Sequence, residues 1–146
     1  MVNKLYEASQ AGVKVELLVR GNCSVMTGVP GVSDNIRIVG IIDRYLEHSR
    51  IFIFAAGGEE KVFIGSADWM PRNLDNRVEV VTPIYDPLIK EEMKRIVDFG
   101  LKDTLQARVV DGMGENRFNE VPEGETPFRS QEALYEYYLA ENNKNE

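Results

Sequence analysis

The sequence predicts an α/β or α+β sandwich in which a mixed β-sheet is flanked by helices. Short apolar runs typical of strands alternate with amphipathic segments, and several of these runs follow one another as hairpins. The composition, with 43% hydrophobic and 28% charged residues, is that of a globular chain with a real core. Its 146 residues suffice for one compact domain, so we expect a single domain over residues 1–146. No G-x-G-x-x-G follows a strand, which argues against a dinucleotide-binding fold.

The first part of the chain predicts a helix, a strand and a long loop. Residues 3–10 have a helical pattern that Gly12 ends, and residues 13–19 form an apolar strand. Residues 20–31 are rich in Gly, Ser, Thr and Pro and are long enough for a functional loop. A simple surface connection remains the alternative for this loop.

The central part predicts a short strand at residues 35–39 and a helical turn at residues 41–47. The turn would place Ile42, Tyr45 and Leu46 on one face. Two further strands at residues 50–56 and 61–65 flank A-G-G-E-E, where a glycine can adopt positive φ in a hairpin turn.

The last strands and helices follow from turn and cap signals. Residues 77–81 predict a strand in which Glu79 and the valines Val78 and Val80 face opposite sides. Asp86 and Pro87 are typical of a helix start. We also expect an extended segment at residues 104–110, a surface loop at 112–128, a last helix capped by Ser130, and a frayed tail at 142–146.

Charge and cysteine content limit the function classes. The net charge of −7 argues against binding of nucleic acid or anionic membrane over the whole surface. Cys23 is the one cysteine, so no internal disulfide can form, which fits a reducing cytoplasmic setting. Cys23 is either a nucleophile or, more simply, a small residue packed under a loop. The sequence has neither a bilayer-spanning apolar run nor a signal-peptide pattern.

Three cationic side chains indicate phosphate chemistry. His48 is the only histidine, and Arg50 shares its strand face by period-two spacing. Arg20 ends the first strand, and its guanidinium fork matches phosphate oxygens. The alternatives are a core histidine with one satisfied hydrogen bond and a surface arginine in an ion pair. Glu79 is either a solvated strand residue or the carboxylate that holds a cation or orients the His48 imidazole.

The run that begins at His48 resembles the phospholipase D superfamily pattern. H-S-R, G-S-A-D and P-R-N-L-D-N-R-V-E-V follow the order of its H-x-K, G-S-x-N and later Asn-x-x-E elements. Arg50 replaces the lysine of that pattern, Ala55 stands at its acidic position, and Asp68 stands at its asparagine. This chain therefore has one degenerate copy, whereas a working phosphodiesterase of that superfamily needs two.

A closer resemblance is to the polyphosphate kinase family, in its last phospholipase D-like domain. It rests on motifs between residues 12 and 138: V-E-L-L-V-R-G-N-C-S, G-V-S-D-N-I, I-I-D-R-Y-L-E-H-S-R-I-F-I-F, G-S-A-D-W-M-P-R-N-L-D-N-R-V-E-V-V-T-P and F-R-S-Q-E-A-L-Y-E-Y. The resemblance implies a phospholipase D-like sandwich fold. It also implies reversible transfer of the ATP γ-phosphate through a histidine of the preceding domain to polyphosphate.

The resemblance assigns roles to individual residues. His48 matches the second active-site histidine, Arg20 matches an arginine that grips phosphate, and Arg50 adds a phosphate-binding cation. Arg77 and Glu79 match the nucleotide and catalytic region, and Gln131 matches a late polar site residue.

The resemblance also implies partners. These are ATP or ADP, polyphosphate, the remaining domains of the same polypeptide and further copies in a homo-oligomer. Magnesium would serve the full-length enzyme, and we assign no metal ligand in this chain and expect it to bind no cofactor stably by itself. The expected location is cytoplasmic, with peripheral membrane association as a further possibility.

Two alternatives remain open. One is a phosphodiesterase half-site that dimerises to bring two His48 residues together. The other is a non-catalytic module that binds polyphosphate by charge.

Overall fold

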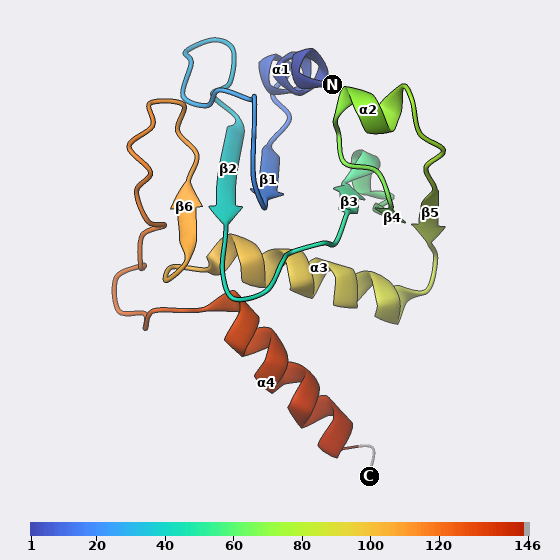
Figure 1. The fold of residues 1–146 in the computed structure, drawn as a ribbon, viewed down its shortest axis with the longest axis vertical. Coiled ribbons are helices and arrows are strands. Elements are labelled where there is room, and N and C mark those ends of the chain that lie inside the picture. Colours follow the sequence, from blue (N-terminus) through green and yellow to red (C-terminus); the bar gives the residue numbers. More distant parts are fainter. Residues whose placement is uncertain (145–146) are drawn as a thin grey trace. The chain divides into compact units, whose positions relative to one another are not determined.

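The computed structural model describes residues 1–144, and the chain forms two compact units. The first unit joins Met1–Glu47 to Phe99–Glu146, and the second is His48–Asp98. Figure 1 shows the elements in chain order. They are α1 (Val2–Gln10), β1 (Val15–Val19), β2 (Ile36–Ile41), β3 (Ile51–Phe54), the 3₁₀ turn η1 (Ala56–Gly58), β4 (Lys61–Gly65), α2 (Pro71–Leu74), β5 (Val81–Ile84), α3 (Pro87–Lys102), β6 (Ala107–Val109) and α4 (Ser130–Asn143).

The first unit contains a three-stranded sheet in the order β1-β2-β6 (Figure 1). Strand β1 pairs in parallel with β2, with Val15 opposite Ile36. Strand β6 pairs with the other edge of β2 in the antiparallel direction, with Val39 opposite Val109. The sheet is therefore mixed, which confirms the predicted class.

The core of the first unit lies on both faces of this sheet, because side chains alternate along a strand. On one face, Ile36 and Ile38 pack with residues of helix α1, among them Leu5 and Tyr6. On the other face, Val39, Ile41 and Ala107 pack with Leu18 and Leu101. Strand β2 is buried from both sides, as expected for the central strand of a layered α/β unit.

Helix α3 approaches strand β1 closely at Gly100. A Cβ added at Gly100 would lie 2.3 Å from Leu18 Cδ2, so only glycine fits without a shift of Leu18. Helix α4 contributes Tyr137, whose ring meets Phe99 edge to face at a centroid distance of 6.4 Å. The last turn of α3 thus packs against β1 through Gly100 and against α4 through Phe99.

The second unit contains an antiparallel sheet in the order β3-β4-β5. Phe52 lies opposite Phe63, and Phe63 lies opposite Pro83. The turn between β3 and β4 places Gly57 at φ 67° and Gly58 at φ 101°. The predicted hairpin with positive-φ glycines is thus confirmed.

The predicted helical turn at residues 41–47 is wrong. Strand β2 continues to Ile41, and the residues that follow are irregular. The three side chains expected on a common face are exposed: Ile42 by 78%, Tyr45 by 65% and Leu46 by 73%. Hydrogen bonds from residues distant in sequence satisfy this backbone instead of helical ones, as described below.

The predicted strand at residues 77–81 is also wrong, because the ladder begins only at Val81, opposite Gly65. Glu79 lies in an irregular segment, and Val78 is fully exposed. Helix α2 (Pro71–Leu74) lies just before this segment. The segment is held at Ser66, whose amide donates to the Val80 carbonyl and whose Oγ accepts from the Val80 amide, each at 3.0 Å.

Of the two helix caps predicted from the sequence, one is present in the structure and one is not. Asp86 Oδ1 accepts the amides of Leu88 at 2.8 Å and Ile89 at 3.2 Å, as predicted for an N-cap. Ser130 is not the cap of α4 but its first residue, and its hydroxyl donates to Asp103. None of the helices described here is both long and apolar enough to cross a bilayer.

Candidate functional site

His48 and Arg50 form the centre of a polar cluster in the second unit. Arg50 Nη1 lies 2.7 Å from His48 Nδ1 and donates to the His48 carbonyl oxygen at 2.8 Å. Arg50 Nε donates to Asp68 Oδ1 at 3.1 Å. The Arg50 side chain is only 15% exposed, so its charge acts in a partly desolvated setting.

Arg50 and Asp68 are two of the three positions at which the chain departs from the phospholipase D pattern, the third being Ala55. In the structure they form one ion pair. The cationic replacement and the acidic replacement therefore compensate each other. The imidazole keeps an arginine beside it, and the arginine is itself oriented by a carboxylate.

Glu79 belongs to a second polar group in the same unit. Ser66 Oγ donates a short hydrogen bond to Glu79 Oε2, and Asn73 Nδ2 donates to Glu79 Oε1 at 2.8 Å. These hydrogen bonds, helped by the charges of Arg77 and Arg50, lower the pKa of Glu79. Glu79 is thus held as a carboxylate by Ser66 and Asn73, and not by a cation or His48 as predicted from the sequence.

Arg77 lies in the turn after α2 and is exposed. Its positive charge helps to lower the pKa of Glu79, but less than the hydrogen bonds from Ser66 and Asn73 do. Asn73 is 3% exposed, and its buried Oδ1 has no hydrogen-bond partner among the described residues. Ser66 and Asn73 were missed as site residues, although both lie inside the quoted motif G-S-A-D-W-M-P-R-N.

Arg20 and Gln131 lie in the first unit, and both contact Glu47. Arg20 Nη1 donates to the Glu47 carbonyl oxygen at 3.1 Å. Gln131 Nε2 donates to Glu47 Oε1 at 2.7 Å and to the Tyr45 carbonyl at 2.8 Å, and Gln131 Oε1 accepts the Tyr45 amide at 2.9 Å. Two predicted site residues more than a hundred positions apart thus converge on the residue before His48.

An ion pair of high geometric quality lies next to this contact. Arg129 Nε and Nη2 donate to the two oxygens of Asp43 at 3.0 and 2.7 Å. The Asp43 side chain is only 3% exposed. The hydrogen bond from Arg129 lowers the pKa of Asp43, and the same contact raises that of Arg129. No sequence signal links these residues, which lie 86 positions apart.

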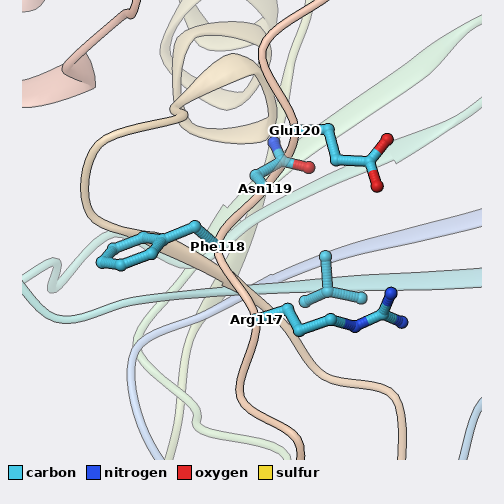
Figure 2. A pocket seen from close by; sticks show the side chains of 5 residues that line it. Arg117, Phe118, Asn119 and Glu120 are labelled. Carbon is cyan, nitrogen blue, oxygen red and sulfur yellow. The ribbon is translucent and has the colours of Figure 1, made fainter.

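Two hollows lie in the first unit, away from the predicted site residues. The first, about 300 Å³, is lined by Val109, Arg117, Phe118, Asn119 and Glu120. Figure 2 shows the Arg117 and Glu120 side chains on one side of this segment and Phe118 on the other. The second, about 290 Å³, lies beside Met26 and Gly112. Within residues 1–144, no group of three or more His, Cys, Asp or Glu side chains is placed to hold a metal ion.

Comparison with known proteins decides the family. A family model described as "Polyphosphate kinase C-terminal domain 2" matches residues 1–131. The chain belongs to this family. The resemblance inferred from the motifs is thus confirmed.

The chain is also similar to individual polyphosphate kinases, both in sequence and in structure. A polyphosphate kinase of Escherichia coli strain K12 is 49% identical over 138 residues, which are 94% of this chain and 20% of that protein. One of Halalkalibacterium halodurans is 45% identical over 136 residues, 93% of this chain and 19% of that protein. The crystal structure of polyphosphate kinase from Porphyromonas gingivalis matches with a TM-score of 0.91 and 42% identity, over 98% of this chain and 22% of that one. The fold class is confirmed, and the chain spans about a fifth of the length of its relatives.

Proposed function

We propose that this chain forms part of the phosphoryl-transfer site of a polyphosphate kinase. In this reaction the γ-phosphate of ATP passes to a histidine of a preceding domain and then to the end of a polyphosphate chain, reversibly. The observation that carries the proposal is the arginine-bound His48 in a chain of this family. Phosphoryl transfer requires mainly positioning and neutralisation of charge on phosphate oxygens.

Each proposed role follows from the chemistry of the side chain. Arg20 supplies a permanent positive charge for phosphate oxygens. His48 donates a hydrogen bond to phosphate when protonated and accepts a proton when neutral. Arg50 orients the imidazole and adds positive charge, while Glu79 keeps a fixed negative charge that orders Ser66 and Asn73.

ATP and polyphosphate are the proposed partners, and residues of other domains would complete their binding. Magnesium as a cofactor of the full-length enzyme stays a prediction. Arg77 as a nucleotide-binding residue, a homo-oligomeric enzyme and a cytoplasmic location stay predictions. Nucleotide binding was also expected of Gln131, but its contacts with Tyr45 and Glu47 favour a different role.

The proposal is tested by substitution in the complete polypeptide that carries this chain. His48→Ala and Arg20→Ala should each lower polyphosphate synthesis from ATP by roughly 100-fold or more, because each removes charge or a hydrogen bond from the transferred group. Arg117→Ala, which removes a surface arginine of the loop before α4, should leave the rate unchanged and serves as the matched control. Near-normal rates in both site variants, with native circular dichroism, would exclude these residues from the site.

Two other functions give different outcomes. A phosphodiesterase half-site predicts hydrolysis of bis(p-nitrophenyl) phosphate that rises with protein concentration. A non-catalytic module predicts salt-dependent binding of polyphosphate that survives His48→Ala better than Arg20→Ala. Neither is favoured by a specific contact of the structure.

A further inference from the structure

We infer that Arg129 and Gln131, at the start of helix α4, are positioning residues for His48. They fix residues 43–47, the segment that leads into His48 and that we call the lead-in. This inference rests on the proposed function of His48. It assigns to Gln131 a role in holding the protein main chain rather than in binding nucleotide.

The lead-in is not held by burial of its large side chains. Tyr45 and Leu46 are 65% and 73% exposed, and so is Ile42 just before them, by 78%. The lead-in is neither helix nor strand, so no ladder fixes its backbone. An irregular segment whose large side chains are exposed would sample many conformations unless specific polar contacts restrained it.

Such contacts are present at alternate residues of the lead-in. At Asp43, Arg129 makes a two-pronged ion pair with a carboxylate that is almost fully buried. The buried carboxylate could not lose this partner cheaply, because it would then be an uncompensated charge. The contact therefore fixes the position of the first lead-in residue against the start of α4.

At Tyr45, the Gln131 amide closes a ring with both main-chain groups of a single residue. Its oxygen accepts the Tyr45 N–H and its nitrogen donates to the Tyr45 C=O. A side-chain amide that matches both groups in this way fixes the peptide orientation as a strand neighbour would. The second proton on the Gln131 nitrogen goes to Glu47 Oε1, so both donors of the amide are used.

At Glu47, Arg20 donates to the carbonyl oxygen of the peptide bond that joins Glu47 to His48. The lead-in is thus restrained at residues 43, 45 and 47, up to the peptide bond before His48. Because reaction rates depend on placement at the scale of about 1 Å, loosening this segment should slow the reaction even without a lost contact to substrate.

The first test uses the single histidine of the chain, whose imidazole gives one set of carbon–proton NMR signals. We expect Gln131→Ala and Arg129→Lys to shift or broaden these signals in the 146-residue chain. Gln10→Ala, the matched control, removes a glutamine that donates to the main-chain oxygen of Gly31, and should leave them unchanged. Unchanged imidazole signals in both lead-in variants, with a native amide spectrum, would overturn the inference.

The second test separates positioning from nucleotide binding in the complete enzyme. Gln131→Ala should lower kcat by about 10- to 100-fold and leave KM for ATP within about twofold, because the reacting group is misplaced while ATP contacts remain. A raised KM with unchanged kcat would overturn the inference and make Gln131 a nucleotide ligand. If the unaltered enzyme makes no polyphosphate, the proposed function fails, and the imidazole signals alone decide the role of the lead-in.

Discussion

Asp103 shows how a single buried carboxylate can organise one end of a unit. It is fully buried, and its Oδ1 accepts the amides of Leu105, Gln106 and Ala107 at 2.9, 2.7 and 3.1 Å. Its Oδ2 accepts the amide and hydroxyl of Ser130 at 2.7 and 2.8 Å. One side chain thus joins the turn before β6 to the start of α4.

We predict that Asp103→Asn destabilises the chain by about 3 kcal/mol. The substitution removes the negative charge and one of the two acceptor oxygens, so the buried hydrogen bonds to this side chain are weakened or lost. Asp75→Asn, at an exposed position after α2, should change the free energy of unfolding by less than about 0.5 kcal/mol. Urea unfolding of both variants measures the difference. Equal stability of the two variants would show that the Asp103 cluster does not support the fold.

The same residue predicts a dependence on pH. Burial raises the pKa of Asp103, but the hydrogen bonds from Gln106, Ser130 and Ala107 outweigh it and lower the pKa below its usual value. The unfolded state then binds the proton more readily, so the stabilisation is present above about pH 4 and is lost as the pH falls through the lowered pKa. Part of the acid destabilisation measured by urea unfolding should therefore be missing in Asp103→Asn.

At the same scale, the sequence suggests candidate site residues more readily than it suggests which side chains they contact. His48, Arg50 and Arg20 could be predicted as candidates because each belongs to a motif that its chemistry explains, and their roles stay predictions. The pairing of Asp43 with Arg129 could not be found, because it depends on how distant segments meet and not on local spacing. Glu79 was also predicted as a candidate, but the partners expected for it were wrong, since they depended on a strand that does not form.

At the scale of elements, Gly100 of α3 gives a stability prediction against helix propensity. In an open helix, Gly→Ala would stabilise by about 1 kcal/mol. Here the new Cβ meets Leu18 Cδ2 within β1, so we expect Gly100→Ala to destabilise by about 1–3 kcal/mol. Thermal unfolding measures this change in stability. Glu91→Ala on the same helix serves as the control, because its effect is governed by helix propensity. A higher melting temperature for Gly100→Ala would show that Leu18 can move aside.

Elements with their own local signals were predicted well. Helix α3 has a capping aspartate and a proline at its start, and the β3–β4 hairpin has its glycines. The segments at residues 41–47 and 77–81 were wrong for a common reason. In both, periodic apolar residues suggested a regular element, but tertiary hydrogen bonds to Gln131 or Ser66 hold the backbone in an irregular form.

At the scale of the whole molecule, the length of the relatives leads to a prediction about activity. The chain covers 20% of a relative polyphosphate kinase, and we propose that the histidine that takes the phosphate lies outside this chain. We predict that the purified 146-residue chain makes no polyphosphate from ATP, measured by incorporation of labelled phosphate. Robust synthesis by the purified chain would contradict the proposed division of the site between domains.

In the sequence, the second unit is inserted between the two segments of the first. This order along the chain also sets the order in which the units can fold during synthesis. Residues 48–98 form their β3-β4-β5 meander from neighbours in sequence, so this unit has its partners as soon as it is made. The first unit is made of two segments that are separated in the sequence. Val39 of β2 therefore cannot pair with Val109 of β6 until the second segment has been synthesised. A ribosome stalled before β6 would therefore expose an unpaired edge of β2. That interval is when the chain is most exposed to aggregation and to chaperones.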